Sequence, residues 1–189
     1  ELEFEWGLTD LECDLHVLAT LQAALRAGQW RVTVAVFRER EIVAIWPGYH
    51  DTALGMAFDI GSTTIAAHLV DLASGEALAS AGRMNPQIRF GEDLMSRVSY
   101  VMMHPGAEKQ MCEAVRTAVA ELIVEVCAEA EQTPDNILDC TFVGNPIMHH
   151  LLLGLSPVEL GGAPFALATD SAVTVSAQRL NLGINPGAR

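Results

Sequence analysis

The sequence is short of positive charge, and this shortage excludes two classes of partner. The 189 residues include only 11 lysines and arginines against 24 acidic residues, which gives a formal net charge of −13. Because such a surface repels the phosphates of nucleic acids and the anionic headgroups of membranes, we expect the protein to bind neither. The chain also lacks a secretory signal and any apolar run of roughly 18 residues, so we expect no membrane span and a cytoplasmic location.

Clustered cysteines are absent as well. The four cysteines are Cys13, Cys112, Cys127 and Cys140, and none belongs to a CxxC pair or to another spacing typical of metal ligands. Three of them lie in apolar runs, where we expect them to act as small buried hydrophobic side chains. The sequence therefore predicts no zinc or iron–sulfur site within these residues.

The composition is that of a folded protein. Half of the residues are hydrophobic and 19% are charged, so we expect a packed core and not a disordered chain. The length suffices for one domain, or for a small domain joined to a larger piece. Since the chain begins at Glu1 without a methionine, we expect it to be a piece of a longer protein.

The most informative stretch is residues 54–71, where two apolar, strand-like runs flank a short turn. The turn contains Gly61 and three hydroxyl residues, Ser62, Thr63 and Thr64. So short a connection predicts an antiparallel hairpin. Gly61 leaves room for the backbone to turn and for a ligand to approach. Successive N–H groups in such a turn can cradle phosphate oxygens, and the hydroxyls can add further donors.

Asp59 stands at the end of the first of these strands, in a run that is otherwise apolar. Burying an unpaired acid is costly, which favours a ligand-binding role over an ordinary hairpin. A bound phosphate needs Mg²⁺, and Asp59 is placed to hold that ion directly or through its waters. An ordinary turn with hydroxyls at its tip is the alternative interpretation.

The N-terminal 50 residues form a small unit of their own. We expect a helix that is capped by Thr9 or Asp10 and ends at Gly28, followed by a β-hairpin. One helix and one hairpin are too little for an independent core, so this unit should pack on other sequence. Residues 47–51 have the composition of a linker.

Beyond the central hairpin, the pattern predicts an α/β unit. A strand over 77–83 completes an antiparallel meander. Helices over 91–103 and 106–131 then lead to a strand over 138–143 that joins the sheet in parallel. We expect the remaining segment to cover the sheet, with strand-like residues at 172–175. The methionines of the two helices should belong to the core: Met95, Met102, Met103 and Met111.

Polar residues at two places have both a functional and a structural interpretation. Asn85, Gln87 and Asp93 stand where they could line a cleft, but Asp93 could instead cap a helix and form a surface ion pair with Arg97. Asn145 ends a strand at the edge where open α/β sheets bind ligands. Because Pro146 follows it, Asn145 could instead cap the next helix.

Three runs carry a family resemblance: Asp59-Ile60-Gly61-Ser62-Thr63-Thr64, Asn85-Pro86-Gln87, and His149-His150-Leu151-Leu152-Leu153-Gly154. They resemble the reductive activators of corrinoid proteins, which are large ferredoxin-like ATPases. The first run is also shared by the actin, sugar-kinase and Hsp70 superfamily. The resemblance implies that residues 1–50 end a small α+β middle domain. Residues 51–189 would form the N-terminal part of an actin-like ATPase domain, with its ribonuclease-H-like α/β subdomain.

The resemblance also implies a function. The whole protein would use ATP and Mg²⁺ to reduce cob(II)alamin to Co(I) in a partner corrinoid protein. Asp59 would bind Mg²⁺, residues 61–64 would hold the β- and γ-phosphates, and Asn85 and Asp93 would line the cleft. Asn145 would orient water, and since an amide is no general base we expect slow, partner-gated hydrolysis. The family's [2Fe–2S] cluster should lie outside these residues, and a homodimer is left open.

Two other functions stay open. A small-molecule kinase of the same superfamily would need an acid where this chain has Asn145. A non-catalytic binding module is the third choice. The adjacent His149 and His150 point about 100° apart on a helix, so at most one can face a cleft. We expect a buried, hydrogen-bonded histidine, with contact to the corrinoid partner as the alternative.

Overall fold

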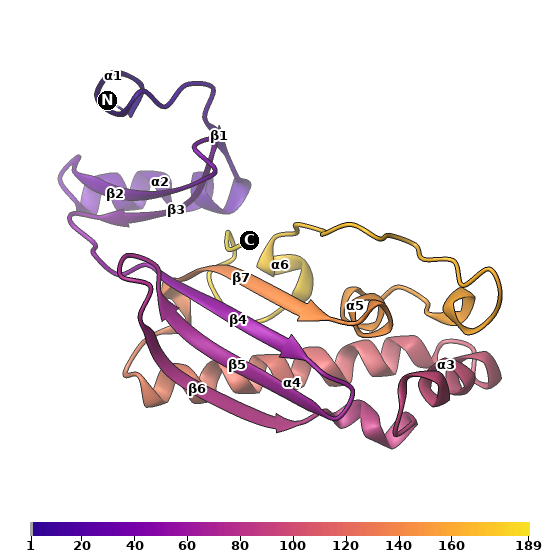
Figure 1. Cartoon of the computed structure of the whole chain (residues 1–189). Helices are drawn as coiled ribbons and strands as arrows, with labels where there is room; N and C mark the ends of the chain where they lie inside the picture. Colours follow the sequence, from indigo (N-terminus) through magenta and orange to yellow (C-terminus); the bar gives the residue numbers. More distant parts are fainter. Residues whose placement is uncertain (1) are drawn as a thin grey trace.

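The structure is a computed structural model that describes residues 2–189. A small N-terminal unit stands at one end of a larger α/β unit (Figure 1). The small unit has a three-stranded sheet in the order β1-β3-β2, with α2 packed on β3. Its elements are α1 (Leu2–Trp6), β1 (Glu12–Cys13), α2 (Leu15–Ala27), β2 (Val32–Phe37) and β3 (Glu41–Pro47).

The cap predicted for the first long helix is wrong. Helix α2 begins at Leu15, and its cap is Asp14, whose carboxylate accepts the N–H of His16. The reason is a contact that is distant in sequence. Glu12 and Cys13 pair in parallel with β3, opposite Glu41 and Ile42, so the backbone just before the helix is extended.

The larger sheet follows the prediction. Its order is β6-β5-β4-β7, with β4, β5 and β6 forming the antiparallel meander and β7 pairing in parallel with β4. The ladder sets Ile60 opposite Gly144, so β4 and β7 end side by side at the same edge. The strands are β4 (Leu54–Ile60), β5 (Thr64–Asp71), β6 (Ala77–Met84) and β7 (Ile137–Gly144).

Helices cover one face of this sheet, and the core lies between them and the strands (Figure 1). Alternate residues of β4, among them Met56 and Phe58, point into the core, whereas Ala57 and Asp59 point to the uncovered face. Phe58 stacks on Phe142 of β7, with ring centroids 4.7 Å apart. The helices are α3 (Leu94–Met103), α4 (Ala107–Glu129), α5 (Pro146–Leu153), α6 (Ala177–Leu180), and the short 3₁₀ helices η1 (Pro86–Phe90), η2 (Pro134–Asn136) and η3 (Val158–Gly161).

Two predictions are wrong, one about a strand and one about the core. Residues 172–175 form no strand. Of the four methionines expected in the core, only Met111 is buried, whereas Met95, Met102 and Met103 are 47%, 57% and 69% exposed. The cause of the second error is that α3 turns a single narrow face to the core, and other side chains occupy that face.

The C-terminal residues connect the two units (Figure 1). The N–H of Arg189 donates to Leu138, and the N–H of Cys140 donates to Arg189, which is the bonding pattern of a parallel ladder beside β7. The guanidinium of Arg189 also bonds to Glu41 and lies 3.5 Å from the carboxylate of Asp14 in the small unit. Among residues 2–189, no helix is long and apolar enough to cross a membrane.

Candidate phosphate-binding site

The turn between β4 and β5 is the centre of the candidate site. The N–H of Gly61 donates to the carbonyl of Thr64 at 2.9 Å, and Ser62 and Thr63 form the tip. A side chain at position 61 has no room, because its Cβ would lie 2.7 Å from the carbonyl oxygen of Thr64. Glycine at this position therefore allows the tight turn that the hairpin needs.

Three successive carbonyl groups of this turn point into the protein. The carbonyl of Gly61 accepts the side-chain amide of Asn85 at 2.8 Å, and the carbonyl of Thr63 accepts the backbone N–H of Asn85, also at 2.8 Å. The carbonyl between them, that of Ser62, accepts the guanidinium of Arg97. Asn85 and Arg97 are both buried, so the inner side of the turn is fixed by side chains that do not reach solvent.

The N–H groups of the same three peptides point the other way. In a trans peptide the carbonyl and the N–H lie on opposite sides, so the N–H groups of Ser62, Thr63 and Thr64 face outward. Within residues 2–189 these three groups donate to no acceptor. The turn thus presents a row of three oriented donors, with the hydroxyls of Ser62, Thr63 and Thr64 beside them. Such a row binds anions, and phosphate above all.

Asp59 lies two residues before Gly61, and its side chain is not buried. Its side chain is exposed on the uncovered face of the sheet, opposite Ala66 of β5 and Val143 of β7. The expectation of a buried acid is therefore wrong, because β4 alternates and is covered on one face alone. An exposed carboxylate at the strand end nevertheless presents the hard oxygen ligands that Mg²⁺ prefers.

Asn145 begins α5 as its N-cap. Its side-chain oxygen accepts the N–H groups of Ile147 and Met148 at 3.0 and 3.1 Å. That oxygen is therefore engaged, and within the described residues the amide NH₂ has no partner. The oxygen of Asn145 therefore caps the helix, and only its NH₂ group is free to donate to water or phosphate. The residue stands at the same sheet edge as the turn, directly after Gly144.

The other residues predicted to line a cleft do not lie together. Asn85 is behind the turn and holds its backbone, and Gln87 is buried beside Asn85, so neither faces a ligand. Asp93 is exposed and caps α3 through a reciprocal pair of bonds with Ser96, whose N–H lies 2.7 Å from the carboxylate. The bond from the Ser96 N–H holds the pKa of Asp93 below its ordinary value.

Arg97 does not lie on the surface, where the sequence predicted it. It forms no surface ion pair with Asp93, because its side chain is fully buried at 0% exposure. Its guanidinium donates to Gly91, Gln87, Met148 and Ser62. A signal for this burial exists in the sequence. Position 97 falls three residues after Leu94 and one before Val98, on the apolar face of α3.

Comparison with known proteins identifies the family. The description "RACo middle region" matches residues 54–189, and "RACo linker region" matches residues 1–52. The chain belongs to the RACo family. It is 37% identical over 132 residues to the corrinoid activation enzyme RamQ of Eubacterium limosum, which covers 70% of this chain and 22% of RamQ.

A solved structure agrees with this assignment. The chain superposes on a reductive activator for corrinoid, iron-sulfur protein with a TM-score of 0.83 and 31% identity. That match covers 94% of this chain and 29% of the activator, so the chain spans less than a third of either relative. The predicted resemblance to corrinoid activators and the predicted α/β fold class are both confirmed.

The two histidines of this RACo chain have different settings. His150 is buried, its Nδ1 lies 2.7 Å from the carbonyl of Pro146, and its Nε2 accepts the N–H of Ala168 at 3.0 Å. Both nitrogens are engaged, so His150 has none left for a metal, and the expected buried, hydrogen-bonded histidine is confirmed. His149 is half-buried, and burial lowers the pKa of its imidazole.

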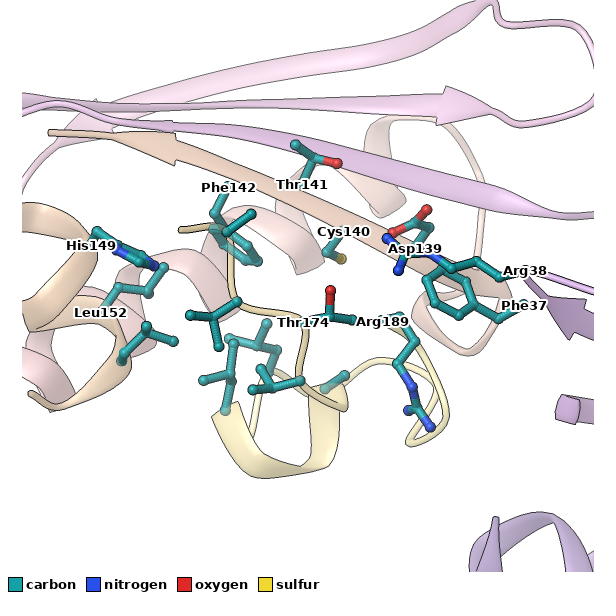
Figure 2. A pocket seen from close by; sticks show the side chains of 17 residues that line it. Phe37, Arg38, Asp139, Cys140, Thr141, Phe142, His149, Leu152, Thr174 and Arg189 are labelled. Carbon is teal, nitrogen blue, oxygen red and sulfur yellow. The ribbon is translucent and has the colours of Figure 1, made fainter. Parts of the chain in front are cut away.

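Two hollows flank α5. One, of about 360 Å³, opens beside the ends of β4 and β7 and is lined by Ile60, Gly144 and Asp170 among others. The second, of about 510 Å³, lies along the outer edge of β7, where Arg189 bonds to Leu138 and Cys140 (Figure 2). Figure 2 shows His149 at one end of it and Arg38 at the other. Only the first hollow adjoins the edge of the sheet where the turn and Asn145 lie.

Proposed function

We propose that this chain is one segment of a longer, ATP-dependent reductive activator that restores cob(II)alamin to Co(I) in a partner corrinoid protein. We assign to it the first phosphate-binding turn of the nucleotide site. The observation that carries this assignment is the row of outward N–H groups at residues 62–64. The carbonyls of the same three peptides, those of residues 61–63, are all bonded by Asn85 or Arg97 on the inner side of the turn. Family membership supports the corrinoid partner, since one relative is named as a corrinoid activation enzyme and the other as a reductive activator for corrinoid, iron-sulfur protein.

Each residue of the site receives a role consistent with its surroundings. The N–H groups and hydroxyls of Ser62, Thr63 and Thr64 bind the β- and γ-phosphate oxygens, because fixed donors need no reorganisation when an anion arrives. Asp59 would hold Mg²⁺ directly or through water, since a single carboxylate together with phosphate and water is a usual way for proteins to bind this ion. Asn145 donates its NH₂ toward a phosphate oxygen or the attacking water.

The residues present do not fit an iron–sulfur cluster. Of the four free cysteines, Cys13 lies in β1, Cys112 and Cys127 lie in α4, and Cys140 lies in β7. Within the described residues no group of three metal-ligating side chains gathers. We therefore place the [2Fe–2S] centre of the activator in a part of the protein beyond this segment. The function of this segment is to bind nucleotide. Closure of the cleft around the nucleotide would then rearrange the surface that contacts the corrinoid partner.

Replacing Asp59 tests this function. In the full-length protein, Asp59→Ala should keep the melting temperature, because the side chain is exposed and has no protein partner among the described residues. ATP-dependent formation of Co(I) in the corrinoid protein, followed by its visible absorbance with a low-potential reductant, should fall by about 100-fold, or 2.7 kcal/mol. Asp51→Ala, which removes an exposed acid in the linker, is the matched control.

Two results would contradict the proposal. Wild-type reduction that proceeds equally well without ATP would remove the nucleotide from the mechanism and favour a binding module. Unchanged ATP-dependent reduction by Asp59→Ala would remove Asp59 from the site.

A further inference from the structure

Arg97 is a buried cation without an anionic partner. Its side chain is fully buried, and no carboxylate of residues 2–189 lies within 4.0 Å of its guanidinium. Asp93, one turn earlier, is exposed and bonded to Ser96 instead. Burial lowers the pKa of the Arg97 guanidinium, and the charge of Asp93 offsets this only in part. Arginine nevertheless stays protonated in proteins. A buried charge with no countercharge destabilises the fold, so its presence calls for an explanation.

The partners of Arg97 are neutral groups. The guanidinium donates to the carbonyl of Gly91 at 3.0 Å, to the side-chain oxygen of Gln87 at 3.2 Å, and to the sulfur of Met148 at 3.1 Å. The fourth acceptor is the carbonyl of Ser62. These acceptors satisfy the donors but do not neutralise the charge, and a thioether sulfur is a weak acceptor.

The bond to Ser62 connects this charge to the turn. The carbonyl of Ser62 belongs to the same peptide as the N–H of Thr63, which is one of the three outward donors. A cation that hydrogen-bonds the carbonyl polarises the peptide and makes its N–H a stronger donor. The guanidinium thus lies behind the row of donors, on the side opposite to the one where an anion would bind.

We propose that Arg97 is a positioning residue for phosphate: its buried charge, transmitted through the Ser62–Thr63 peptide, strengthens anion binding at the turn and is balanced when the anion binds. Arg97 itself does not touch the ligand. This inference rests on the proposed function, since it takes the turn to bind the phosphates of ATP.

Arg97→Met and Arg97→Lys in the full-length protein separate charge from packing. For Arg97→Met, calorimetry should give a Kd for Mg·ATP at least tenfold higher, about 1.4 kcal/mol, and a Kd for adenosine within twofold of wild type. Arg97→Lys keeps the charge and should lose less affinity for Mg·ATP than Arg97→Met. Arg89→Met, which removes an exposed arginine of η1, should leave both affinities unchanged.

A merely structural arginine predicts a different pattern. Its loss would lower the melting temperature and weaken adenosine and Mg·ATP to the same degree, leaving their ratio unchanged. That outcome overturns the proposal.

A second pair of variants leaves Arg97 in place, in case its replacement prevents folding. Met148 is buried, and Glu and Gln have similar length and volume to Met. Met148→Glu puts a carboxylate beside the guanidinium and neutralises it internally, so the affinity for Mg·ATP should fall about tenfold below that of Met148→Gln. Equal affinities in this pair would also overturn the proposal.

Failure of this inference differs from failure of the proposed function. If wild type binds Mg·ATP and all charge variants bind it equally, the role of Arg97 is wrong and the function stands. If wild type does not bind Mg·ATP but binds inorganic pyrophosphate, the function is wrong, and the same variants decide the role of Arg97 with pyrophosphate. If wild type binds neither, both are wrong.

Discussion

The side chain of Asn145 has two separable roles: its oxygen caps α5, and its NH₂ group is proposed to act in ATP hydrolysis. Asn145→Ala removes an oxygen that accepts two backbone N–H groups, those of Ile147 and Met148. Losing a side-chain N-cap costs about 1 kcal/mol, with a range of roughly 0.5–2. We expect the upper half of this range, because α5 has eight residues and its first turn carries the buried Met148. Urea unfolding of the 189-residue chain, followed by circular dichroism, measures the change.

Asn145→Ser separates the two roles, because serine still caps a helix but has no NH₂ group. We expect its unfolding free energy to stay within about 0.5 kcal/mol of wild type, since serine and asparagine rank together as caps. In the full-length protein its ATP turnover should fall about tenfold, or 1.4 kcal/mol. If turnover is unchanged, Asn145 is a cap alone. If Asn145→Ala leaves the unfolding free energy within about 0.3 kcal/mol of wild type, the capping argument itself is wrong.

Two further predictions concern pH and affinity. Burial raises the pKa of the Cys140 thiol from 9.0 to about 12, so the unfolded chain ionises first and stability is lost between pH 9 and about 12. Between pH 8 and pH 10.5, the free energy of unfolding measured with urea should fall by about 2 kcal/mol more in wild type than in Cys140→Ala. Equal losses in the two proteins would contradict the raised pKa of Cys140. The isolated chain should bind Mg·ATP only in the millimolar range, about −4 kcal/mol, because under the proposed function it supplies one side of the cleft. Micromolar affinity by calorimetry would mean that the cleft is complete within these residues.

Much of the fold follows from local sequence. The alternation of apolar residues in β4, the short turn at Gly61 and the two helices before β7 are enough to predict the meander and the parallel fourth strand. These features depend on periodicity and turn chemistry within a few residues. The turn residues could be identified for the same reason, since their chemistry lies in four consecutive positions.

The remaining features depend on contacts that no local pattern contains. Arg97 bonds to Ser62 and Met148, which are 35 and 51 residues away, and only the assembled fold brings them behind one turn. The start of α2 depends on pairing between β1 and β3. The exposure of Asp59 depends on which face of the sheet the helices cover, and an apolar run alone does not reveal that a strand is covered on one side.

An amide NMR titration of the 189-residue chain with Mg·ATP tests the central claim most directly. We predict that the signals of Ser62, Thr63 and Thr64 shift most, because their N–H groups are the outward donors of the turn. Adenosine without phosphates should leave these three signals in place. If the three signals stay fixed while Mg·ATP shifts others, such as those along the outer edge of β7, the turn does not bind the phosphates and the proposed site is wrong.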